Sequence, residues 1–186
     1  MRIFLGLGTN LGDREANLIR AKDLLVKNGV MILGQSQVLE TKPLYGVKQP
    51  DYLNQVVEAR ADASAEELLF ICKKIEKEMG RPVDLPISNV KFGGVCARAQ
   101  SAPPPERGKR VRNESRIIDI DILFYGEEKV EMANLLLPHH GVFERGFVIR
   151  GMCELAPEFF ERMREKSTKI RKNLRKRAWN VHNLCS

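Results

Sequence analysis

Residues 30–61 read VMILGQSQVLETKPLYGVKQPDYLNQVVEARA, and this stretch decides how the chain folds. Val30–Leu39 and Leu53–Ala61 are both predicted strands, because aliphatic residues recur through them between turn signals. The segment that joins them, from Thr41-Lys42-Pro43 through Pro50, reads as a loop. A doubly wound dinucleotide-binding sheet needs a helix after each strand, so two strands in succession argue against it.

The segment before this stretch supplies a strand and a helix. Arg2–Gly8 reads as a short buried strand, and an amphipathic helix is predicted from Asp13 to Lys27, where Asn28-Gly29 ends it. The apolar stripe of this helix consists of Leu18, Ala21, Leu24 and Leu25.

The segment after it supplies a second helix and a last strand. Ser64 and Glu67 have the spacing of a capping box, and Gly80 ends the helix that they begin. Ile117–Tyr125 reads as a strand, and Phe143–Leu155 as a further helix. The order strand, helix, strand, strand, helix, strand predicts a ferredoxin-like α+β sandwich, with an antiparallel sheet and helices on one face. The apolar face of the second helix carries Leu68, Leu69, Ile71 and Ile75.

Length and composition favour one globular domain. The chain has 186 residues, of which 43% are hydrophobic and 30% charged. No apolar run approaches the roughly 20 residues that span a bilayer, and the N-terminus turns glycine-rich too early for a signal peptide. We therefore expect a cytoplasmic protein. Its four cysteines are scattered, so they predict neither a zinc site nor disulfides.

The net charge of +7 is concentrated near the C-terminus. Residues 162–177 hold nine basic side chains against the single acid Glu165, which leaves the rest of the chain close to neutral. A neutral body does not fit a protein that coats a phosphate backbone, although the tail itself could touch nucleic acid or an anionic membrane. We favour a solvated tail and expect neither a nucleic-acid nor a membrane partner.

Two carboxylates in the last strand are the strongest candidates for chemistry. Asp119 and Asp121 alternate with apolar residues, so both point to the same face of the sheet. Like charges on one face repel unless a cation offsets them, and magnesium prefers such oxygen ligands. A solvent-exposed face is the alternative. Arg116 and Arg81 favour the first interpretation, because phosphoryl transfer requires a metal and guanidinium groups around the phosphates.

Three further motifs are weak when each is taken alone. Residues 6–12, GLGTNLG, lack the Lys-Ser/Thr of a phosphate-binding loop, and we interpret them as a tight turn. Tyr52 and Asn54 share a strand face, where they could bind a heterocycle or simply pack in the core and a turn. A third group could contact phosphates or stack on a planar ring, and it comprises His139, His140, Arg145 and Phe147.

Taken together and in this order, these motifs resemble the hydroxymethyldihydropterin pyrophosphokinase family from about Ile3 to Pro157. QPDYLN at 49–54 and RIIDID at 116–121 are its most specific stretches. The resemblance implies the ferredoxin-like fold and the transfer of pyrophosphate from ATP to 6-hydroxymethyl-7,8-dihydropterin, with release of AMP, in folate biosynthesis. It also implies two magnesium ions held by Asp119 and Asp121. The remaining roles are carried over position by position: Arg81 and Arg116 assist transfer, Thr41, Leu44, Tyr52, Asn54 and Phe147 bind the pterin, and Glu76, Ile122, His139 and Arg145 bind the nucleotide.

The chain departs from the family pattern in its longest loop and at its C-terminus. Asn113-Glu114-Ser115 stands where relatives carry Trp-Gly-Pro before the arginine, and proline-rich and glycine-rich sequence extends the loop. We therefore divide the chain into a pterin pyrophosphokinase domain at 1–161, with an extended catalytic-loop insertion at 82–115, and a basic tail at 162–186 of unknown role. We expect a monomer. A catalytically weakened pterin-binding or nucleotide-binding relative and, more remotely, an RNA-binding module are the competing hypotheses.

Overall fold

The central sheet has the strand order of a ferredoxin-like fold. The structure is a computed structural model that describes residues 1–43, 49–80 and 115–168. Its strands pair in the order β2-β4-β1-β5, and every pair of neighbours is antiparallel. The strands are β1 (Arg2–Thr9), β2 (Met31–Gln35), β4 (Tyr52–Arg60) and β5 (Asp119–Tyr125), and the short β3 (Leu39–Thr41) also pairs with β4. The fold predicted from the sequence is therefore confirmed.

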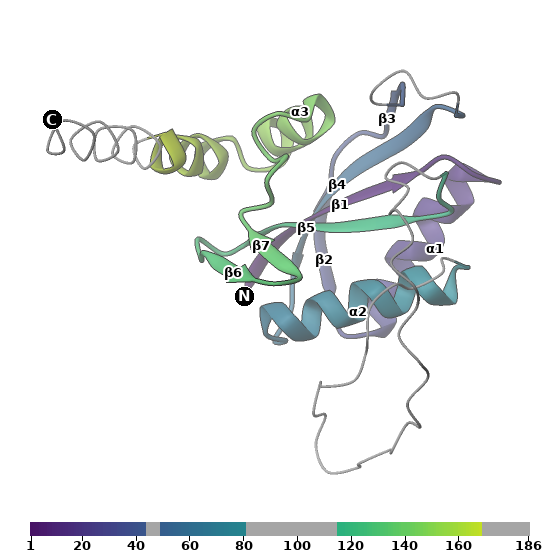
Figure 1. The fold of residues 1–186 in the computed structure, drawn as a ribbon, viewed down its shortest axis with the longest axis horizontal. Helices are drawn as coiled ribbons and strands as arrows, with labels where there is room; N and C mark the ends of the chain where they lie inside the picture. The colour runs from purple at the N-terminus through teal and green to yellow at the C-terminus, as the bar shows by residue number, and fades with distance from the viewer. Residues whose placement is uncertain (44–48, 81–114, 169–186) are drawn as a thin grey trace, which may run out of the picture.

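Two helices cover one face of this sheet (Figure 1). Helix α1 (Arg14–Lys27) connects β1 to β2, and α2 (Ala65–Glu78) connects β4 to β5, so each crossover passes one intervening strand. Asp13 caps α1 by accepting a hydrogen bond from the Ala16 amide. Ser64 and Glu67 form both bonds of a capping box at the start of α2, as predicted.

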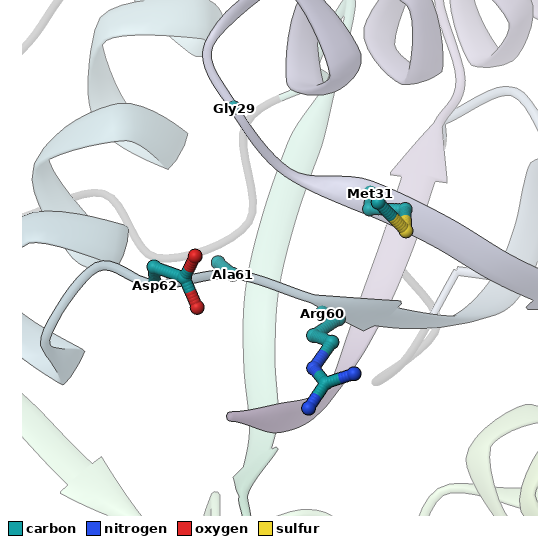
Figure 2. A pocket seen from close by; sticks show the side chains of 5 residues that line it. All are labelled: Gly29, Met31, Arg60, Ala61 and Asp62. Atoms are coloured by element: carbon teal, nitrogen blue, oxygen red, sulfur yellow. The ribbon is translucent and has the colours of Figure 1, made fainter.

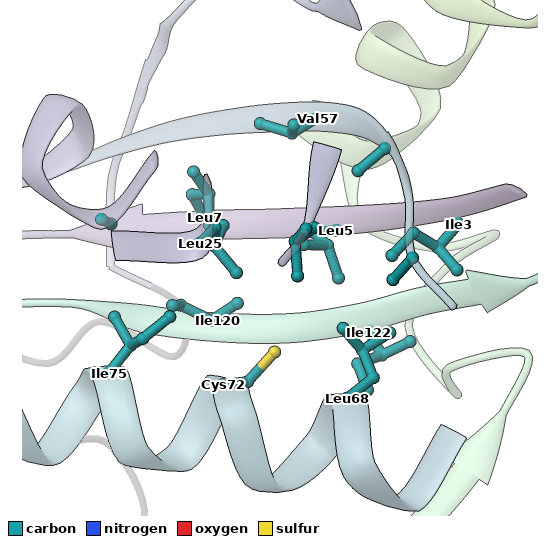
Figure 3. Packing of buried hydrophobic residues seen from close by; sticks show 14 of the residues in the cluster. Ile3, Leu5, Leu7, Leu25, Val57, Leu68, Cys72, Ile75, Ile120 and Ile122 are labelled. Atoms are coloured by element: carbon teal, nitrogen blue, oxygen red, sulfur yellow. The ribbon is translucent and has the colours of Figure 1, made fainter. Parts of the chain in front are cut away.

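The main hydrophobic core lies between these helices and the sheet. Every second residue of β1 points into it, and the predicted stripe of α1 is buried in it. Figure 3 shows Leu68, Cys72 and Ile75 of α2 packed against Ile120 and Ile122 of β5. Because Ile120 and Ile122 face the helices, the alternation of the strand turns Asp119 and Asp121 to the opposite face.

A third helix, α3 (Gly146–Leu155), packs on that opposite face (Figure 1). It begins later than predicted, because residues 141–144 form a turn. A further helix covers residues 157–168, and together with Phe4 and Phe124 these segments form a second hydrophobic cluster. The sheet thus has helices on both faces, whereas the helices of the repeating βαβ crossovers lie on one.

Two segments differ from the predicted elements. The predicted strand Val30–Leu39 is divided into β2 and β3, because its pairing with β4 shifts at Ile32/Gly34 and again before Leu39. A small hairpin of β6 (Val130–Met132) and β7 (Leu135–Leu137), which was not predicted, follows β5. The predicted loop 82–115 lies outside the described residues except for Ser115. Among the described helices, none has the length and apolar character needed to cross a membrane.

Candidate functional site

The candidate site is the part of the second sheet face where β1 ends and β4 and β5 begin. Gly6 and Gly8 lie in the middle of this face, so β1 places no side chain on this part of it. Asp121 pairs with Gly6 and Asp119 with Gly8, while Asn54 lies opposite Gly8 on the other side. A Cβ atom on Gly8 would come within 2.9 Å of the Asn54 Oδ1 atom, so Asn54 lies close over this glycine. One row across three strands therefore holds an amide, a glycine and a carboxylate.

Each carboxylate of β5 is paired with an arginine. Arg116 donates from Nη1 to Asp119 Oδ2 at 2.7 Å, and Arg145 donates from Nη1 to Asp121 Oδ2 at 2.8 Å. The two arginines come from different parts of the chain, one directly before β5 and the other at the N-cap of α3. The fold thus brings together four of the side chains predicted for phosphate chemistry.

His139 lies beside the second of these pairs. Its Nδ1 atom accepts a hydrogen bond from the Gly141 amide, and its Nε2 atom is 3.9 Å from Asp121 Oδ2. Burial lowers the pKa of His139, with Asp121 opposing the shift and Arg145 reinforcing it. A neutral ring that accepts at Nδ1 carries its proton on Nε2, so it presents a donor to the open face. The His140 ring lies against this ring, with 4.2 Å between ring centroids and a tilt of 38° between the ring planes.

A cluster of polar side chains lies at the other end of the row, on β3 and β4 and on the segment before β4. Asn54 donates from Nδ2 to the Thr41 hydroxyl at 2.7 Å, and Tyr52 donates its hydroxyl proton to Gln49 Oε1 at 3.2 Å. Burial raises the pKa of Tyr52, which keeps its phenol protonated. Phe147, in the first turn of α3, is half-buried at the border of the second cluster. These are a ring, an amide and hydroxyls that can hold a small heterocycle.

The buried Asn10 joins the two sides of the site, although the sequence of its segment, residues 6–12, predicts only a tight turn. Its side-chain Oδ1 atom accepts a hydrogen bond from the backbone amide of Arg116 at 2.6 Å, and its backbone amide donates to the Arg116 carbonyl at 3.0 Å. The same side chain donates from Nδ2 to the Pro50 carbonyl at 3.3 Å and to Gln49 and Ser115 at 3.4 Å. Asn10 therefore ties the segment before β4 to the segment before β5. A polar residue directly after a buried strand was the available signal.

The side chains of Glu76, in α2, and Ile122, in β5, lie on the helix-covered side of the edge strand β5. Glu76 is 1% exposed and accepts from the Ile120 amide at 2.9 Å and from Lys73 at 2.9 and 3.0 Å. Burial raises the pKa of Glu76, with Lys73 opposing the shift. The Ile122 side chain is buried in the main core, so only its backbone is left to contact a ligand. A nucleotide that touches these two residues and the carboxylates must wrap around the edge of β5.

The donor set fits a magnesium ion that arrives with phosphates. In the described part of the chain, no group of three or more histidine, cysteine, aspartate and glutamate side chains forms a metal site. Magnesium keeps near-octahedral oxygen coordination, commonly from one or two carboxylates, waters and substrate phosphates. Asp119 and Asp121 on one face supply such a pair without forming a complete protein cage.

The remaining predicted residues lie elsewhere. Leu44 and Arg81 fall outside the described residues. A separate pocket at the far end of β4 is lined by Gly29, Met31, Arg60, Ala61 and Asp62 (Figure 2). Arg60 ends β4 whereas Tyr52 begins it, so this pocket is not part of the candidate site.

A sheet face that combines paired carboxylates with arginines is typical of phosphoryl-transfer enzymes, and here a histidine and a cluster of polar and aromatic side chains lie beside it. Comparison with protein families makes the class specific. The family described as 7,8-dihydro-6-hydroxymethylpterin-pyrophosphokinase matches residues 4–91 and 99–157. The chain belongs to this family, as its sequence predicted.

Similar proteins come from plants and bacteria. The chain is 35% identical over 153 residues to the mitochondrial folate synthesis bifunctional protein of Pisum sativum and 32% identical over 153 residues to the folate synthesis bifunctional protein of Arabidopsis thaliana. In both cases 82% of the chain aligns, and it spans about a quarter of the relative's length (25% and 26%). It is also 30% identical over 156 residues to the 2-amino-4-hydroxy-6-hydroxymethyldihydropteridine pyrophosphokinase of Bacillus subtilis, covering 83% of this chain and 78% of that protein.

Proposed function

We propose that this chain transfers pyrophosphate from ATP to the hydroxymethyl oxygen of 6-hydroxymethyl-7,8-dihydropterin, with release of AMP, as a step of folate synthesis. The observation that carries this proposal is the row formed by Asn54, Gly8 and Asp119. Adjacent strands lie about 4.8 Å apart, so the heterocycle pocket on β4 and the carboxylate on β5 are separated by roughly 10 Å. The glycine between them carries no side chain, so an acceptor oxygen and a phosphate can meet between the Asn54 amide and the Asp119 carboxylate.

The pterin side of the site uses groups that pair with a planar, polar ring. Asn54, held by Thr41, offers its amide oxygen as an acceptor, and Tyr52 and Phe147 supply aromatic surface. Phe147 projects from α3 on the same sheet face, where it can stack on the ring. Leu44 is assigned to this pocket by family resemblance alone.

The nucleotide side of the site consists mainly of charged side chains that can hold a metal ion and phosphates. Asp119 and Asp121 are the residues that would hold magnesium, which when bound neutralises phosphate charge and orients the triphosphate. His139 can donate from Nε2 to a phosphate oxygen, and Arg145 can bind phosphates with its planar guanidinium. Glu76 and the Ile122 backbone lie around the edge of β5, on the side we assign to the nucleoside.

In the proposed step the hydroxymethyl oxygen attacks the β-phosphorus in line. The new O–P bond forms as the bond from the β-phosphorus to the oxygen of AMP breaks, and the hydroxyl proton is released. Charge spreads over the equatorial oxygens in this transition state, where Arg116 stabilises it. Asn10 binds both the backbone amide and the backbone carbonyl of Arg116, so the position of this arginine needs little reorganisation. We assign Arg81 the same function from the resemblance.

A coupled assay for AMP release tests the proposed reaction. We expect AMP formation that requires ATP, magnesium and the pterin together. Turnover should fall about a hundredfold to a thousandfold in Asp119→Asn, since single electrostatic groups of this kind contribute about 10²–10³. Asp62→Asn, at the far end of β4, is the matched control and should retain turnover. Pterin binding without AMP would instead support the weakened relative, and unchanged activity in Asp119→Asn would contradict the assigned role.

Location and assembly belong to the same proposal. We place the protein in the cytoplasm as a monomer, with ATP and the pterin as its partners. The pea relative is named as mitochondrial, and that location is a property of that protein.

A further inference from the structure

The two arginine–carboxylate pairs have a consequence for how metal enters the site. Arg116 and Arg145 each donate to the Oδ2 atom of a different aspartate, at 2.7 and 2.8 Å. All four side chains are between 23% and 30% exposed. They are therefore partly shielded from water, where attraction between opposite charges is stronger than on an open surface.

Magnesium and the arginines compete for the same two carboxylates, Asp119 and Asp121. A magnesium ion binds carboxylate oxygens at about 2.0–2.1 Å. A guanidinium within 2.8 Å of the same Oδ2 atom would place two cations against one oxygen. Magnesium that binds alone must therefore displace an arginine from its carboxylate or share that carboxylate with the positive charge of the arginine.

A magnesium ion that arrives on a triphosphate does not have this cost. The metal can take the carboxylates while the phosphates accept the released guanidinium groups. We propose that Arg116 and Arg145 are internal counter-ions that hold the metal ligands closed to free divalent cations, so that magnesium is taken up together with the nucleotide. This inference rests on the proposed ATP reaction and adds an order of binding to it.

The surroundings of both arginines allow this exchange as a side-chain movement. The Arg116 backbone is held by Asn10, so its position is fixed while the guanidinium can turn. The Arg145 side chain crosses over Gly141, where a Cβ atom would lie 2.7 Å from its Nε atom. His139 Nε2 is 3.9 Å from Asp121 Oδ2, where it can stay beside this carboxylate as the guanidinium leaves.

The test measures Mn²⁺ binding from the electron paramagnetic resonance signal of the free ion, with and without a non-hydrolysable ATP analogue. We expect Arg116→Gln and Arg145→Gln to bind Mn²⁺ alone about tenfold or more tightly than the wild type, because each loses a charged hydrogen bond of the competing pair. With the analogue, the same variants should bind more weakly than the wild type. The effect of one substitution thus has opposite signs in the two conditions.

The matched control is Arg162→Gln, which removes an arginine paired with Glu127 at 2.8 Å on the surface. It separates competition at the site from a general change in charge, and unfolding midpoints verify that each variant is folded. An equal rise in affinity in Arg162→Gln, or wild-type binding of Mn²⁺ alone as tight as that of Arg145→Gln, would overturn the inference. Analogue binding that still depends on Mn²⁺ would then leave the proposed function standing. If the wild type does not bind Mn²⁺ with the analogue, the proposed function falls and this inference with it.

Discussion

Single residues in this site combine binding with the hydrogen bonding of the fold, and Glu76 shows this most directly. It lies in α2, yet its carboxylate accepts the amide of Ile120 on the edge strand β5. An edge strand exposes amides that need acceptors, so Glu76 completes the hydrogen bonding of β5. We assign the same side chain to the nucleotide, which means that a substitution affects two properties that must be measured separately.

Glu76→Gln and Glu76→Ala separate these two properties. Glutamine keeps an acceptor for the Ile120 amide and removes a buried charge, so the free energy of unfolding at pH 7 should stay within about 1 kcal/mol of the wild type or rise. Alanine leaves the amide without this acceptor and should cost roughly 1–3 kcal/mol. Urea unfolding measures both, and both variants should weaken ATP binding. Equal stability of the two variants would show that the Ile120 bond contributes little.

The pH dependence of unfolding gives a second measurement on Glu76. Burial raises the pKa of Glu76 above its usual 4.5. A group with a raised pKa in the folded state contributes stability that is present below 4.5 and is lost as pH rises through the folded value. The wild type should therefore lose stability over that range relative to Glu76→Gln. Parallel profiles would show that another group titrates there.

At the scale of the elements, the position of α3 sets the geometry of the site, because Arg145 is its N-cap residue and Phe147 lies in its first turn. This helix approaches the sheet closely at Gly151, where a Cβ atom would lie 2.5 Å from Val56 Cγ2 and 3.2 Å from Ser36 Oγ. Val56 lies in the central strand β4, and its Cβ atom is also within 2.7 Å, so this side chain cannot move away easily. Glycine is therefore required for the helix to pack at this distance.

We expect Gly151→Ala to destabilise the protein by about 1–2 kcal/mol. Overpacking costs about 1–3 kcal/mol, whereas alanine regains up to about 1 kcal/mol of helix propensity. The displaced helix should also raise the KM for the pterin through Phe147. Gly146→Ala is the matched control, since it lies in the same helix with open space around its Cβ position, and it should be neutral or stabilising. Thermal unfolding and steady-state kinetics measure both effects, and equal behaviour of the two variants would contradict close packing at Gly151.

The elements also show what the sequence could predict. The strands and helices with a clear apolar period, such as Arg2–Thr9 and Ala65–Glu78, were predicted to within two residues because burial dictates their pattern. The division of one predicted strand into β2 and β3 was not predicted, because a one-residue shift of register depends on the partner strand β4. The alternation of Asp119 and Asp121 predicted a shared face from one strand alone. The position of Asn10 directly after a buried strand was a local signal, but its contacts are with residues about 40 and 105 positions away, so no local pattern could predict those partners.

At the scale of the whole molecule, the helix at 157–168 crosses the domain boundary predicted after residue 161. Met163 is 3% exposed in the second cluster, beside Phe159 and Phe160. Arg162 and Lys166 both pair with Glu127, which follows β5. The first seven residues of the predicted tail therefore pack on the domain. Residues 169–186, which lie outside the described part, hold six basic residues and no acidic one, and hence most of the net charge of +7.

Two truncations separate packing from charge. A protein that ends at Thr168 keeps Met163 and the Glu127 pairs, so it should retain its unfolding midpoint and its AMP-forming activity. It should elute from a cation exchanger at clearly lower salt and lose any affinity for RNA, because such binding depends on clustered positive charge. A protein that ends at Glu161 loses a buried methionine and should be less stable by roughly 1–3 kcal/mol. Loss of turnover in the longer truncation would assign the basic segment a part in the reaction. Retained RNA binding would instead place a nucleic-acid surface on the folded domain and revive the RNA-binding hypothesis.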